Sequence, residues 1–195
     1  MEENNMDQQT ILLIPSTLED KRIVYNWLCE SDVSDAMFGF DSNERPTWEE
    51  FCEDYADVYF DGTNPEYGRV FMIVLNGKKI GCVSYACFHL REHMAELDIW
   101  MDSEANCGKG YGTLAIIELC NYLASDLCIN NYIIRPSVKN KRAIKAYNKA
   151  GFKEVEKSSV KQVLHKYLTD QYYEEYGQGD YGEEGTLTLV MERTE

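Results

Sequence analysis

The chain has 195 residues, of which 34 are acidic and 19 basic, giving a formal net charge of −15. Such a polyanion repels nucleic acid and anionic membranes, so we exclude both as partners, whereas a small polycationic ligand is attracted. Acidity that merely keeps the protein soluble is the alternative interpretation. Apolar residues make up 44% of the chain, enough for a core of its own, and we expect one domain over residues 1–195.

Cysteine usage and hydropathy predict the compartment. Seven cysteines occur without Cys-x-x-Cys pairs, which indicates reduced thiols and no metal site. The N-terminus is polar and acidic, unlike a secretory signal, and no apolar run has membrane-spanning length. We expect a cytoplasmic protein, and the sequence leaves monomer and homodimer both open.

Hydrophobic periodicity and turn residues predict the elements of the first half. These are a strand at Ile11–Ile14, a helix from Leu18 to Cys29 capped by Thr17, a loop over 31–45, a helix from the capping box at Thr47 to about Tyr59, and a hairpin of strands Arg69–Leu75 and Lys79–Phe88 around Asn76-Gly77. The buried side of the first helix is expected to carry Ile23, Tyr25, Trp27 and Leu28.

The second half continues the alternation of strands and helices. We expect a central strand Ala95–Met101, a helix Leu114–Ala124, a strand Asn131–Arg135, a helix from Asn140 to the C-cap Gly151, a strand from Phe152, an extra helix Val160–Tyr176, a loop Gly177–Gly185 and a closing strand Gly185–Met191. This order fits an α+β domain with a mixed sheet.

Three glycines lie where the central strand passes to the next helix, in the segment Asn106–Thr113. Glycine lets the backbone approach a ligand closely, and the first turn of a helix offers unpaired N–H groups and a positive dipole end. The segment therefore predicts a phosphate or pyrophosphate loop, with a plain tight turn as the alternative. It is neither a dinucleotide fingerprint nor a Walker loop.

A second motif, from Asn140 to Phe152, reads N-x-x-A-x-x-x-Y-x-x-x-G-F. Together with the glycine loop, it resembles the GCN5-related N-acetyltransferase (GNAT) superfamily, over roughly Ile11 to Val155 plus the final strand. The segments Asn76–Gly81, Leu97-Asp98 and Gly108–Gly112 look, with this motif, like those of the aminoglycoside 6'-N-acetyltransferases. The resemblance implies a mixed, mostly antiparallel twisted sheet flanked by helices, two splayed central strands, and acetyl-CoA as co-substrate without a metal.

The resemblance also assigns the cofactor-binding residues. The strand backbone at Ile99, Trp100 and Met101 would bind the pantetheine arm. The pyrophosphate would be bound by loop and helix amides, those of Gly108, Gly110, Tyr111, Gly112 and Thr113. Lys109 would add a charge, or is a solvated lysine. From the second motif, Asn140 and Ala143 would contact CoA, with a simple N-cap as the alternative for Asn140. Cys107 stands where the superfamily usually has Gln or Arg.

Transfer of acetyl to an amine needs a base, a held oxyanion and a proton for the leaving thiolate. By resemblance, Asp98 is the base or amine anchor and Tyr147, which also contacts CoA, the general acid. A surface carboxylate and a packed tyrosine are the plain alternatives. Glu96 shares the face of Asp98 by strand periodicity and holds the cationic substrate, or is solvated.

Two features depart from the aminoglycoside enzymes. Ile99 stands where they often have Gln, and residues 157–185 form an insertion before the last strand that is rich in tyrosine and acid. This insertion could wall the acceptor pocket, form a dimer contact or be a solvated excursion.

We therefore expect an acetyl-CoA-dependent N-acetyltransferase acting on a small polycationic amine, with an aminoglycoside as the most specific candidate. The alternatives are the same chemistry on a polyamine, a siderophore precursor, a lysine or a protein N-terminus, and an acyl-CoA-binding module without catalysis.

Overall fold

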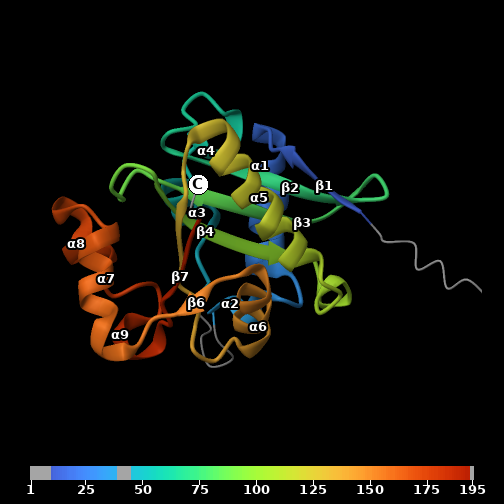
Figure 1. Ribbon diagram of the computed structural model, residues 1–195. Coiled ribbons are helices and arrows are strands. Elements are labelled where there is room, and N and C mark those ends of the chain that lie inside the picture. The colour runs from blue at the N-terminus through green and yellow to red at the C-terminus, as the bar shows by residue number, and fades with distance from the viewer. Residues whose placement is uncertain (1–9, 39–44, 194–195) are drawn as a thin grey trace, which may run out of the picture.

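The computed structural model describes residues 10–38 and 45–193. Within them, seven strands form one sheet in the order β1-β2-β3-β4-β5-β7-β6, and helices lie on both of its faces (Figure 1). The strands are β1 (Ile11–Pro15), β2 (Gly68–Leu75), β3 (Lys78–Ala86), β4 (Met94–Met101), β5 (Asn131–Ile134), β6 (Lys153–Glu154) and β7 (Leu189–Glu192). The α-helices are α1 (Leu18–Glu30), α2 (Ser34–Phe38), α3 (Trp48–Asp54), α4 (Val58–Asp61), α5 (Tyr111–Leu127), α6 (Lys141–Ala150), α7 (Val160–Tyr167), α8 (Asp170–Tyr176) and α9 (Gly182–Gly185).

The sheet is mixed and mostly antiparallel, as predicted, and β4 and β5 are its parallel pair. Their pairing runs only from Met94 opposite Asn131 to Glu96 opposite Ile133. On its other side, β4 stays paired with β3 as far as Met101. The backbone of β4 after Glu96 therefore has no partner on β5, and the predicted splay of the two central strands is confirmed.

Successive side chains of the strands point to opposite faces of the sheet, and each face carries a hydrophobic core. On one face, α5 and α6 pack on residues such as Leu97, Ile99 and Ile134. On the other, α1, α3 and α4 cover the β1–β4 half around Met72 and Trp100. The β5–β7 half of that second face is covered by α7, through the cluster Leu90, Ile133, Leu164, Tyr167 and Leu168.

The local signals of the sequence act as predicted at two turns. Asn76 (φ 50°) and Gly77 (φ 78°) both have left-handed backbones, as a two-residue hairpin turn requires. Thr47 and Glu50 form the predicted capping box: Thr47 Oγ1 accepts from the Glu50 amide at 3.2 Å, and Glu50 accepts from the Thr47 amide at 2.7 Å.

Tertiary contacts correct several boundaries. The helix expected up to Tyr59 is broken into α3 and α4, because Tyr55 leaves the helix to stack on Phe51 at 4.8 Å and to reach β4. The extra helix is likewise two helices, separated where Leu168 bridges to Leu90. A short helix, α2, lies within the expected loop 31–45, of which residues 39–44 are outside the described range.

Two expected burial or boundary positions were also wrong. Ile23 is 37% exposed, and α1 instead buries Val24 and Leu28 against the sheet. Helix α5 begins at Tyr111 rather than Leu114, so the last glycine of the loop lies inside its first turn. No helix of the described residues is long and apolar enough to cross a membrane.

Candidate active site

A cavity of about 490 Å³ lies where β4 and β5 separate. It is bounded by the end of β4, the glycine loop, the first turn of α5, the outer face of α6 and the short helix α2. Most of the predicted cofactor-binding residues line it: Ile99, Trp100, Met101, Gly108, Gly110, Gly112, Thr113, Asn140, Ala143 and Tyr147. Lys109 and Tyr111 do not. Lys109 is exposed outside the cavity, and the Tyr111 side chain is buried in the core.

The glycine loop leaves open space in front of the start of α5. Gly108 (φ 72°) and Gly110 (φ 92°) are left-handed, and a Cβ on either would meet nothing within 4 Å. Gly110 is the N-cap residue of α5 and has no side chain with which to cap the helix. The amides of Gly112 and Thr113 thus lie on the cavity wall at the positive end of a 17-residue helix, which favours an anion there.

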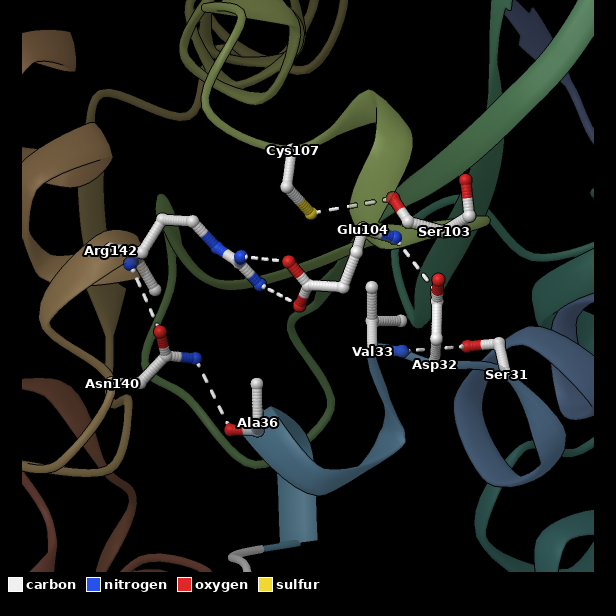
Figure 2. Close-up of polar contacts among 10 residues, drawn as sticks. Ser31, Asp32, Val33, Ala36, Ser103, Glu104, Cys107, Asn140 and Arg142 are labelled. Carbon is white, nitrogen blue, oxygen red and sulfur yellow. Dashed lines mark hydrogen bonds and ion pairs between the residues drawn. The ribbon is translucent and has the colours of Figure 1, made fainter.

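The second motif forms the opposite wall. Asn140 caps α6, its Oδ1 accepting from the Ala143 amide at 3.1 Å, and its Nδ2 donates to the Ala36 carbonyl of α2 at 3.3 Å (Figure 2). Thr113 Oγ1 donates to the Ala146 carbonyl at 3.3 Å and so joins α5 to α6. Tyr147, from the same helix, is 5% exposed, and burial together with the nearby charge of Asp98 raises its pKa well above the usual value.

Asp98 lies on β4 next to the cavity, on the face opposite α5, and is half-buried. Its Oδ1 accepts from the Ile99 amide at 2.8 Å and its Oδ2 from the Tyr55 hydroxyl at 3.3 Å. Burial, followed by repulsion from the carboxylate of Asp180, raises the pKa of Asp98 to about 7. A carboxylate that titrates near neutral pH is suited to proton transfer.

Glu96 shares the face of Asp98, but its oxygens are already engaged. Arg135 donates from Nε to Oε1 at 2.7 Å and from Nη2 to Oε2 at 2.8 Å, and His89 Nε2 lies 2.7 Å from Oε2. Although burial opposes ionisation, these partners lower the pKa of Glu96 to about 2. Glu96 thus joins β4 to the end of β5 through Arg135, and its contact with the substrate amine stays a prediction.

Several residues around this site were not found from the sequence. Arg135 also donates through Nη1 to the Tyr176 carbonyl, and the Tyr181 hydroxyl donates to the Met37 carbonyl at 2.7 Å. Phe88 packs edge-on against Tyr172, with ring centroids 5.6 Å apart. The insertion therefore lies against the site, and its helix α7 packs on Ile133 of β5 and Val190 of β7. Figure 1 shows α7 and α9 beside β7. The tyrosine- and acid-rich sequence of the insertion does not indicate which residues these side chains contact.

Comparison with known proteins agrees with this geometry. Residues 10–153 match the family model described as acetyltransferase (GNAT) domain. The chain belongs to the GNAT acetyltransferase family. It is 28% identical over 159 residues to the aminoglycoside N(6')-acetyltransferase type 1 of Klebsiella pneumoniae, covering 76% of each protein.

Solved structures of other GNAT proteins share the fold. That of the aminoglycoside acetyltransferase AAC(6')-Ib with ribostamycin and coenzyme A has a TM-score of 0.65 at 22% identity, covering 94% of each chain. The spermidine N-acetyltransferase of Vibrio cholerae, with CoA and spermine, has a TM-score of 0.64 at 17% identity, covering 93% of this chain and 95% of its own.

The buried ion pair at the strand fork gives a stability prediction. Glu96→Gln removes the carboxylate that pairs with the Arg135 guanidinium, whose side chain is 6% exposed, and we expect a loss of about 3 kcal/mol in unfolding free energy. Asp170→Asn is the matched control, since it breaks an exposed carboxylate–arginine pair and costs less than about 1 kcal/mol. Urea unfolding of both variants measures this difference, and equal losses would contradict the structural role of Glu96.

For Asp98, in contrast, we predict that neutralising the carboxylate stabilises the folded protein. Its pKa is raised from 3.8 to about 7 on folding, so between these values the folded protein keeps a proton that the unfolded chain releases. The unfolding free energy therefore falls as pH rises through this window. Asp98→Asn removes the charge, while its one amide oxygen can still accept from the Ile99 amide and its NH2 group can donate to the Tyr55 hydroxyl oxygen.

We expect Asp98→Asn to stabilise the protein at pH 8 by at least about 1 kcal/mol, which raises Tm by about 2–4 °C in a chain of this size. The effect should vanish at pH 4 or below, where the Asp98 carboxyl of the folded protein is neutral. Thermal unfolding of both proteins at pH 4, 6 and 8 checks this dependence; a variant that is less stable at pH 8 would contradict the raised pKa.

Proposed function

We propose that this protein transfers the acetyl group of acetyl-CoA to an amine of a small polycationic substrate. The observation that carries the proposal is the adjacency of two features at the fork of β4 and β5. One is a cavity with an uncapped helix start on its wall, and the other is Asp98, whose pKa is about 7. Membership of the GNAT acetyltransferase family supports the same chemistry.

Acetyl-CoA suits the cavity in shape and charge. The unpaired backbone of β4 at Ile99–Met101 can pair with the amide groups of the pantetheine arm as a strand would. The first-turn amides of Gly112 and Thr113 suit the diphosphate. Basic side chains of α6, Lys141, Arg142, Lys145 and Lys149, line the same cavity. Similar folds have been solved with acetyl-CoA or coenzyme A bound.

The chemistry follows from the two ionisable groups. An aliphatic amine arrives as an ammonium ion and must lose a proton before it can attack, and Asp98 accepts that proton. The nitrogen then attacks the thioester carbonyl, the tetrahedral oxyanion collapses, and the carbon–sulfur bond breaks. The nitrogen loses its second proton to the Tyr147 oxygen, which replaces the proton that Tyr147 gives to sulfur. Tyr147 is protonated at every physiological pH because its pKa is raised, so it can donate a proton to the leaving thiolate of CoA.

The acceptor side favours a substrate with several positive charges. Asp98 and Asp180 supply negative charge, and the rings of Tyr55, Tyr59, Tyr67, Phe88 and Tyr176 form a connected aromatic array beside them. Ammonium groups are attracted to carboxylates and to ring faces alike. We propose an aminoglycoside, on the similarity to aminoglycoside N(6')-acetyltransferases, with a polyamine as the second candidate because the spermidine enzyme shares the fold.

Asp98→Asn tests the proposed base. We expect kcat/KM for the amine to fall by about 10²–10⁴, as loss of a general base does, while the Kd for acetyl-CoA stays within about twofold. In the unsubstituted protein, kcat/KM should rise with pH to a plateau above about pH 7, where Asp98 is ionised, and this rise should be lost in the variant. Asp126→Asn, on the exposed end of α5, is the control. Unchanged turnover in Asp98→Asn would refute the assignment.

A panel of amines tests the acceptor. Release of the CoA thiol is followed with aminoglycosides that do or do not carry a 6'-amino group, with spermidine and spermine, and with lysine derivatives. We expect saturable turnover with the 6'-amino aminoglycosides. Turnover with polyamines alone would keep the chemistry and replace the substrate. Binding of acetyl-CoA without thiol release on any amine would instead favour a binding module.

A further inference from the structure

An arginine–glutamate ion pair joins α6, on the wall of the cavity, to the turn that follows β4. Arg142 lies in the first turn of α6, and Glu104 lies just after β4, four residues before the first glycine of the loop. The guanidinium of Arg142 engages both carboxylate oxygens of Glu104, the Nη2–Oε1 distance being 2.7 Å (Figure 2). Both side chains are roughly half exposed, 42% and 44%, so the pair is open to a competing ligand.

Glu104 is itself held in place from the other side. Its backbone amide donates to Oδ1 of Asp32 at 2.8 Å, in the turn before α2 (Figure 2). Asp32 and Glu104 both raise the pKa of Arg142 further above its usual value. The backbone at Glu104 is therefore held, and the long arginine side chain can turn toward the cavity that it also lines.

The charge pattern of α6 is the reverse of what helix stability favours. Its first turn carries Lys141 and Arg142 and no acidic residue, although the N-terminus of a helix prefers negative charge. Within the described residues, no carboxylate lines the cavity itself, and Arg142 is the basic residue of its lining that has an ion-pair partner. In a chain of net charge −15, this concentration of cations around one cavity calls for an anionic occupant.

We propose that Arg142 exchanges the carboxylate of Glu104 for a phosphate group of acetyl-CoA, so that Glu104 is a built-in competitor for the phosphate subsite. A carboxylate and a phosphate present the same paired oxygens to the arginine fork. When the cofactor is absent, Glu104 pairs with Arg142 at the wall of the cavity. When the cofactor binds, its phosphate takes the guanidinium and repels Glu104. This inference rests on the proposed function, since it presumes that acetyl-CoA occupies the cavity.

The exchange predicts that CoA binds more tightly when Glu104 is removed, although Glu104 contacts the binding residue Arg142. We expect Glu104→Gln to lower the Kd for CoA by about two- to fivefold, the fold-change that one exposed ion pair is worth. Arg142→Met should raise the Kd by about tenfold. In the Arg142→Met background, Glu104→Gln should have a much smaller effect, because the two substitutions remove one and the same competition.

Isothermal titration of CoA into the four proteins of this cycle is the test. Glu184→Gln is the matched control, because it makes the same change of net charge at an exposed pair with Lys157 on the insertion. Titration with 3'-dephospho-CoA separates the two phosphate sources. If the Arg142→Met penalty disappears with this ligand, the 3'-phosphate takes the arginine; if it persists, the diphosphate does.

Two outcomes overturn the inference. If Glu104→Gln binds CoA no more tightly than the Glu184→Gln control, there is no competition; if it tightens binding equally in the presence and absence of Arg142, the effect is general charge repulsion. If the Kd for CoA is unchanged by both substitutions, the exchange is refuted and the proposed function is not. A lack of CoA binding to the unsubstituted protein would instead refute the proposed function, and the exchange with it.

Discussion

The early end of the β4–β5 pairing is the constraint on which the rest of the site depends. Parallel pairing stops after Glu96 and Ile133, while β3 continues to hold β4 to its end. The gap exposes backbone groups that a continuous sheet would have satisfied, and it provides the space that becomes the cavity. The glycine loop and the start of α5 face this space because they directly follow the part of β4 that is unpaired on the β5 side.

Where β4 and β5 separate, backbone hydrogen bonds no longer join them. A side-chain ion pair joins the two strands there instead. Glu96 is in the last residue pair before the strands part, and Arg135 follows the last residue of β5. Their two-point ion pair joins β4 to the end of β5, and the remaining arginine donor holds the carbonyl of Tyr176. One buried guanidinium thereby fixes the branch of the sheet and the position of the insertion together.

The sequence predicted what depends on short-range patterns. The Asn76-Gly77 turn, the Thr47 capping box and the C-cap at Gly151 are readable because each needs a particular residue at one place in the chain. The two motifs also predicted most of the cavity lining. Residues that act through long-range contacts were missed: Arg135 lies 39 positions from Glu96, and Tyr181 lies 144 from Met37. The ion pair of Glu96 was not expected because its counter-charge had no sequence signature. The helix breaks at Tyr55 and Leu168 follow from contacts with β4 and Leu90 that helical periodicity does not report.

The bond from Tyr181 to Met37 bears on how such a chain can diversify. Met37 is part of the wall of the cavity, and Tyr181 belongs to the same insertion that brings Asp180 to Asp98. Residues 157–185 are thus linked to the wall of the cavity through Met37 as well as to Asp98 on the other face of the sheet. Replacing residues 157–185 by another segment would therefore change more than the surroundings of Asp98. The new segment must also replace the hydrogen bond from Tyr181 that supports α2.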